Sequence, residues 1–112
     1  LPADRPVLAE GAALMPVLVA PLLARPAQAM WVVPSESFQR THYPARGEWV
    51  RDIVAQCSDP EQALRNWMDR DVAFARLVAR QTERLGLRLL TVDGTRTIAQ
   101  NASLVEAHFG WK

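Results

Sequence analysis

Three short segments predict buried β-strands: the continuously apolar residues 6–9 and 29–33, and residues 88–92. Unbroken apolar runs are typical of parallel strands, because helices cover both faces of such a sheet and neither side meets water. A helical segment over residues 14–23 separates the first two runs, and parallel neighbours need a crossover of this kind. We therefore expect a parallel sheet.

The longest predicted helix begins after Asp59, where Pro60 follows an acidic cap and Gln62 stands three residues after it, and it ends at Gly86. Apolar residues recur along it at near-helical spacing, so one face is expected to be core. Trp67 and Phe74 lie seven residues apart and should both face the sheet. A closing helix is predicted over residues 97–109.

The order strand, helix, strand, helices, strand, helix indicates an α/β fold, a parallel sheet flanked by helices in three layers. The 112 residues are few enough for one domain over residues 1–112. Apolar residues make up 49% and charged residues 22% of the chain, an ordinary globular balance that argues against disorder.

Charge and cysteine content exclude several classes of protein. Thirteen basic and twelve acidic residues give a net charge of +1, which argues against a nucleic-acid or membrane-surface binder. The apolar run over residues 12–24 resembles a secretory signal, but Pro16 and Pro21 interrupt it and it is too short to span a bilayer, so a buried helix is favoured. A lone Cys57 fits a reducing compartment, so we expect a cytoplasmic protein.

No complete catalytic set is visible in the residues themselves. His42, His108 and Cys57 have none of the spacings of metal sites, so no metal site is expected. The glycines are isolated, and the only lysine is Lys112, so a phosphate-binding loop is absent.

Partial sites instead follow the ends of the three predicted strands, where ligands bind in open α/β sheets. Glu10-Gly11 follows the first strand, and a basic segment from Arg40 to Arg51 follows the second. The turn over residues 93–95 follows the third strand. An acid at a strand end, such as Glu10, can hold Mg²⁺ through water, and the arginines of the basic segment can bind phosphoryl oxygens. The alternative is that Glu10 is an ordinary turn residue and that the arginines form a solvated surface.

Four segments, in the same order, resemble adenylate-kinase-like nucleoside monophosphate kinases, members of the P-loop NTPases. VLAEGAALMP is similar to that family's strand and Asp-Gly-Phe-Pro-Arg turn, and MWVVPSESFQRTHYPAR to its next strand and the arginine pair of its lid. DRDVAFARLVAR resembles its Arg-x-Asp-Asp helix, and LRLLTVDGTRTIAQNASLVEAHF its last strand, Asp-Gly turn and closing helix. The resemblance implies the carboxy-terminal half of a P-loop kinase-like domain, a fragment that lacks the Walker A portion and has a lid-like segment at about residues 35–51.

The resemblance also implies roles for individual residues. Glu10 would be the strand-end acid, and Arg40 and Arg46 would be lid arginines that stabilise the transferred phosphoryl group. Arg70 matches the first arginine of the later helix, with either Arg76 or Arg80 as its partner. The turn residues that would contact the nucleotide base are Asp93, Gly94 and Thr95.

The function implied is a nucleotide-dependent phosphotransferase that uses ATP and Mg²⁺ in the complete protein and acts on a small-molecule phosphate acceptor. Ala12, Ala13 and Leu14 stand where the family's turn has its arginine, which leaves a nucleoside monophosphate acceptor in doubt. The isolated chain is expected to be inactive, to expose a strand edge, and to pair with the missing amino-terminal half or with itself. The alternative is a non-catalytic α/β module that binds a partner through that edge.

Overall fold

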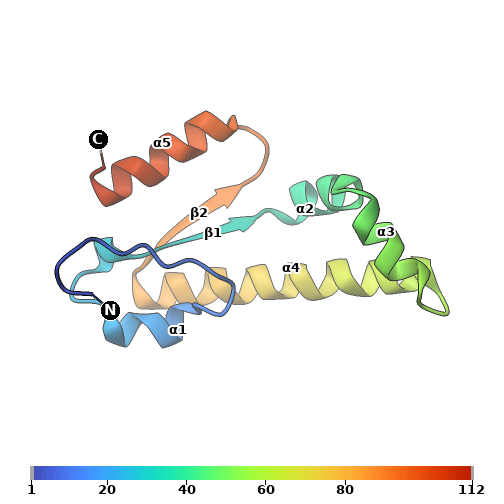
Figure 1. Cartoon of the computed structure of the whole chain (residues 1–112), viewed down its shortest axis with the longest axis horizontal. Coiled ribbons are helices and arrows are strands. Elements are labelled where there is room, and N and C mark those ends of the chain that lie inside the picture. Colours follow the sequence, from blue (N-terminus) through green and yellow to red (C-terminus); the bar gives the residue numbers. More distant parts are fainter. Residues whose placement is uncertain (1, 112) are drawn as a thin grey trace.

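The computed structural model describes residues 2–111, and it is rich in helix (Figure 1). The two strands are β1 (Met30–Pro34) and β2 (Arg88–Val92). The α-helices are α1 (Pro16–Val19), α2 (Glu36–His42), α3 (Glu48–Ala55), α4 (Pro60–Leu85) and α5 (Ile98–Phe109). Three single 3₁₀ turns complete the structure: η1 (Ala20–Leu22), η2 (Pro26–Gln28) and η3 (Tyr43–Ala45).

The sheet contains only two strands among the described residues, and they run parallel, with Met30 opposite Arg88 and Pro34 opposite Val92. Both strands and their direction confirm the sequence prediction for residues 29–33 and 88–92. The predicted three-layer P-loop kinase-like α/β fold is wrong, however, because the chain is mostly helical and its sheet is a single strand pair. In Figure 1 this pair lies between α4 and α5.

The first predicted strand is also wrong. Residues 6–9 form no strand, and Val7 and Leu8 are exposed. A strand needs a neighbour to satisfy its backbone N–H and C=O groups, and no described strand pairs with these residues. Residues 6–9 therefore have the apolar pattern of a buried strand but no neighbouring strand within residues 2–111 to pair with, and they do not join the sheet.

The long helix α4 confirms the prediction from its end signals. The Asp59 carboxylate accepts a hydrogen bond from the Gln62 N–H at 3.1 Å, and Gly86 ends the helix with a left-handed φ of 64°. Twenty-six residues at 1.5 Å each make a rod of about 39 Å. The chain as a whole is also elongated. Its radius of gyration is 16.5 Å, whereas a compact domain of this length has a radius of gyration of about 13 Å.

The face of α4 that packs on the sheet differs from the expected one. The buried positions are Val72, Ala75, Val78 and Thr82, and Val33 of β1 joins the same cluster. Phe74 is instead 40% exposed, since it lies about 100° around the helix from Ala75. Trp67 does not enter this cluster.

Trp67 lies in a different contact, between α3 and α4. Its ring meets that of Trp49 edge to face, with 5.8 Å between centroids. The prediction that Trp67 and Phe74 both face the sheet is therefore wrong, because small and β-branched residues of α4 occupy the face that packs on the sheet. These residues allow the strands to approach the helix closely.

The end of β1 leads directly into α2 and is joined to the end of β2. Ser35 follows β1 and caps α2, accepting a hydrogen bond from the Phe38 N–H at 3.2 Å. Its own N–H donates to the Val92 carbonyl at 2.8 Å, which joins the ends of the two strands. No helix within residues 2–111 is long and apolar enough to cross a membrane.

Candidate functional site

A groove of about 170 Å³ lies at the carboxyl ends of the strands, between the sheet, α2 and α4. Apolar atoms form most of its wall, and three of its polar side chains, Ser35, Glu36 and Gln39, lie at the start of α2. The lining residues are Val33, Pro34, Ser35, Glu36, Gln39, Val72, Ala75, Arg76, Ala79 and Thr91. Ligands of open parallel sheets bind at this end of the strands, so the groove is the candidate site.

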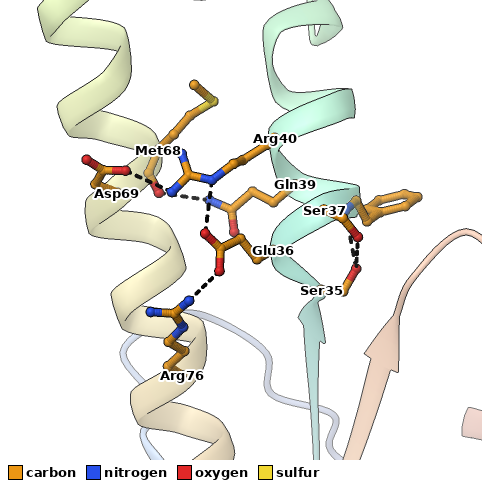
Figure 2. A network of polar contacts seen from close by, with 9 residues as sticks. Ser35, Glu36, Ser37, Gln39, Arg40, Met68, Asp69 and Arg76 are labelled. Carbon is orange, nitrogen blue, oxygen red and sulfur yellow. Dashed lines mark hydrogen bonds and ion pairs between the residues drawn. The ribbon is translucent and has the colours of Figure 1, made fainter.

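A chain of ion pairs links α2 to α4 beside the groove (Figure 2). Arg40 donates from Nη2 to Asp69 Oδ1 at 2.9 Å and from Nε to Glu36 Oε1 at 3.1 Å. The other oxygen of the Glu36 carboxylate accepts a hydrogen bond from Arg76. Two carboxylates thus neutralise two guanidinium groups, and Glu36 is the shared partner of both arginines.

The network shifts the protonation equilibria of Glu36 and Arg40. The hydrogen bond from Arg40 lowers the pKa of Glu36, and the nearby charge of Arg76 acts in the same direction. The hydrogen bond to Asp69 raises the pKa of Arg40, and the bond to Glu36 adds to this effect. The charged forms of Glu36 and Arg40 are therefore favoured in the folded chain.

Gln39 lies in the groove with a side chain that is fully buried, at 0% exposure. Its amide nitrogen donates to the Met68 carbonyl of α4 at 3.4 Å. Its carbonyl oxygen, Oε1, has no hydrogen-bond partner among the described residues. Buried polar atoms are nearly always paired, so an unpaired acceptor marks this part of the groove as a place where a donor is missing.

In the turn after β2, the polar groups of Asp93 and Thr95 form hydrogen bonds with each other. Asp93 Oδ1 accepts hydrogen bonds from the Thr95 hydroxyl at 2.6 Å and from the Thr95 N–H at 3.0 Å. The first of these bonds is the main cause of the lowered pKa of Asp93. Gly94 has a φ of 86°, and a Cβ there would lie 3.3 Å from the Phe38 ring, so the turn packs closely on α2.

The structure does not bring the other predicted arginines into the groove. Arg46 lies over the ring of Tyr43, 4.4 Å from its centroid, in a small hollow lined also by Trp49 and Trp67. Arg70 donates to its neighbour Asp71. Only Arg40, of the three arginines proposed as site residues, touches the network beside the groove.

Glu10 lies in exposed coil before α1, so the end of a strand does not position it. Within residues 2–111 there is no group of three or more histidine, cysteine, aspartate or glutamate side chains that could hold a metal ion. The carboxylates near the groove, Glu36 and Asp69, already bind arginines. These residues do not fit a Mg²⁺ site, and we assign no step to that ion.

The sequence pattern missed Glu36 and Gln39 and left Arg76 and Arg80 as alternatives. Arg76 is the member of that pair that contacts α2, through Glu36, although 40 residues separate them in the chain. Arg76 precedes Arg80 by one helical turn, and such neighbours lie on the same face of a helix. Sequence spacing alone therefore could not distinguish them.

Comparison with models of known families, with curated proteins and with solved structures finds no match for this chain. The chemistry of the groove thus has to be derived from its own residues. Arg76 in the groove and Arg40 beside it offer planar sets of N–H donors, which suit phosphate and carboxylate oxygens. Gln39, Ser35 and Thr91 add uncharged polar groups, Glu36 adds a carboxylate, and the other lining residues are apolar.

Proposed function

We propose that this chain is part of a nucleotide-dependent phosphotransferase, in which Arg40 and Arg76 bind the phosphate groups of the nucleotide. The observation that carries the proposal is their convergence on Glu36 at the carboxyl end of β1. Phosphoryl transfer depends mainly on positioning and charge stabilisation, and arginine is well suited to both.

The exposure of the network makes an exchange of partners feasible. The side chains of Arg76 and Glu36 are 62% and 41% exposed. Ion pairs that are open to water contribute little net stability, so a phosphate group can displace the carboxylate at small cost. Arg76 has five N–H donors, of which the pair with Glu36 engages Nη2.

The groove also limits what this chain can bind alone. Its volume of about 170 Å³ is below the 300–1,000 Å³ of typical ligand pockets, so it can hold part of a nucleotide. The chain has no glycine-rich loop to bind the remaining phosphates. We therefore expect weak binding by the isolated chain and propose that a partner segment supplies the rest of the site.

Titration of the ¹⁵N-labelled chain with ATP, followed by NMR, tests this function. Resonances of residues 35–40 and of Arg76 should shift with ATP, and adenosine at equal concentration should leave them unchanged because it lacks phosphates. The shifts should weaken as salt is added, since the arginines are exposed. Replacing Arg76 with alanine should abolish them.

Arg84 provides a matched control for Arg76, because it is an exposed arginine on the same helix outside the groove. The Arg84→Ala variant should bind ATP like the unaltered chain. Equal shifts with ATP and adenosine, or equal losses in the two variants, would contradict phosphate binding by Arg76. An ATP response spread over unrelated residues would do the same.

A second candidate is a non-catalytic module that binds a partner strand at the edge of the sheet. The observation that favours it is Val32, which is 54% exposed in the middle of β1 while its pair Leu90 is 5% exposed. The Ser35 N–H donates to Val92 of β2, and the backbone groups of successive residues in a strand point alternately to its two sides. The N–H and C=O of Val32, three residues earlier, therefore point away from β2, to the unpaired edge of β1. Such an edge accepts further strands, either from a missing amino-terminal half or from a second copy.

Sedimentation at increasing protein concentration tests this candidate for self-association. The Val32→Lys variant should shift the chain toward monomer while leaving the ATP response of the groove intact. A chain that stays monomeric at every concentration would rule out pairing with itself.

A further inference from the structure

The unpaired carbonyl of Gln39 is a feature that phosphate binding leaves unexplained. Phosphate groups at neutral pH are mostly fully ionised, with oxygens that accept hydrogen bonds, and Oε1 of Gln39 is itself an acceptor. The amide is oriented, because its nitrogen donates to the Met68 carbonyl at 3.4 Å. The wall of the groove therefore contains a buried acceptor that has no partner among the described residues, and its natural complement is an O–H or N–H group.

The surroundings of this acceptor narrow the kind of ligand. Glu36, next to Gln39 in the groove, offers only acceptor oxygens, while Arg76 offers only donors. Val72, Ala75 and Ala79 form an apolar wall on the α4 side. The combination suits a short carbon chain with a donor group at one end and an anionic group at the other.

We infer that the groove binds a small phosphorylated alcohol: its hydroxyl group donates to Oε1 of Gln39 and its phosphate binds Arg76. This inference rests on the proposed function and names the class of its product: the phosphate at Arg76 is the group transferred from the nucleotide, and the hydroxyl at Gln39 is one that the transfer leaves free. The volume of about 170 Å³ is below the 300–1,000 Å³ of typical ligand pockets, so the ligand has to be small.

A matched pair of probes isolates the hydroxyl contact without any substitution. Glycerol 3-phosphate carries hydroxyl groups on its carbon chain, and propyl phosphate has the same phosphate and the same number of carbons but no hydroxyl. NMR titration of the unaltered chain should give a dissociation constant roughly fivefold lower for glycerol 3-phosphate, the scale of one net hydrogen bond. The resonances of residues 35–40 should shift with both compounds.

Two variants assign the contacts to their residues. Gln39→Met keeps a side chain of similar length without polar acceptors at its end, and it should remove the preference for glycerol 3-phosphate. Arg76→Gln should weaken both compounds equally and leave their ratio unchanged. Thermal melts of both variants establish that they fold, and if Gln39→Met does not fold, the ratio measured on the unaltered chain still decides the question.

The outcomes separate this inference from the proposed function. Equal affinity for the two probes in the unaltered chain, or a preference that persists in Gln39→Met, would overturn the role of Gln39. Absence of any shift with either probe would overturn the site as a whole. A hydroxyl preference that depends on Gln39, together with no response to ATP, would support the alcohol site and reject the nucleotide-dependent function.

Discussion

Shortening Val78 to alanine tests the packing that holds α4 against the sheet. Val78 is 3% exposed and belongs to the cluster that includes Val33 and Ala75. The change removes two carbon groups, each worth about 0.8 kcal/mol on burial, so the loss of transfer free energy is about 1.6 kcal/mol. The cavity adds to this loss, and the higher helix propensity of alanine offsets part of it, by about 0.6 kcal/mol.

The net expectation for Val78→Ala is a loss of about 2 kcal/mol in the free energy of unfolding. Urea denaturation followed by circular dichroism measures it, and the transition midpoint should fall while the slope stays unchanged. Ile98→Ala is the control, because Ile98 is 90% exposed and its truncation should stay within about 0.5 kcal/mol. Equal effects of the two substitutions would refute the assigned core face of α4.

Two further predictions concern the ion-pair network and the last helix. The pKa of Glu36 is lowered in the folded chain, so its ionisation stabilises the fold fully above its ordinary pKa of 4.5, and this contribution is lost as pH falls through the lowered value. Over this acidic range, the melting temperature of Glu36→Gln should therefore fall less steeply with pH than that of the unaltered chain. Parallel curves for the two proteins would contradict the pairing. Thr97→Ala should lower the free energy of unfolding by about 1 kcal/mol, because the Thr97 hydroxyl accepts a hydrogen bond from the Gln100 N–H at 3.2 Å. Urea denaturation measures this change, and an unchanged free energy of unfolding would show that the cap contributes nothing.

Local signals predicted the elements that depend on local chemistry. The start of α4 at Pro60 follows from the Asp59 cap, and its end follows from Gly86, which alone among residue types adopts a left-handed φ readily. The closing helix α5 begins after Thr97, where the side chains of Thr97 and Gln100 cap each other's backbone. Each of these signals lies within a few residues of the boundary that it sets.

The sheet could not be predicted to the same depth, because a strand exists only with a partner. Residues 29–33 and 6–9 have similar apolar patterns, yet the first run pairs with residues 88–92 and the second remains exposed coil. The core face of α4 depends likewise on which residues the strands approach. Phe74 contributes more apolar surface than Ala75, but the close approach of the sheet favours Ala75.

The candidate site shows the same limit more sharply. Arg40 was recognisable as a basic residue after a strand, whereas its contact with Asp69 spans 29 positions and the contact between Glu36 and Arg76 spans 40. Gln39 has no distinctive sequence context, and its significance comes entirely from burial without a partner for its carbonyl. Residues of this kind become visible only when the fold places them.

Glu36 connects the stability of the chain with its proposed function. It neutralises Arg40 and Arg76 and so ties α2 to α4 in the absence of a ligand. We propose that a phosphate group takes its place and keeps both arginines paired, because phosphate offers more acceptor oxygens and more negative charge than a carboxylate. In the proposed site, phosphate binding therefore requires the movement of one exposed carboxylate rather than the ordering of two long side chains, because the ion pairs already order both arginines.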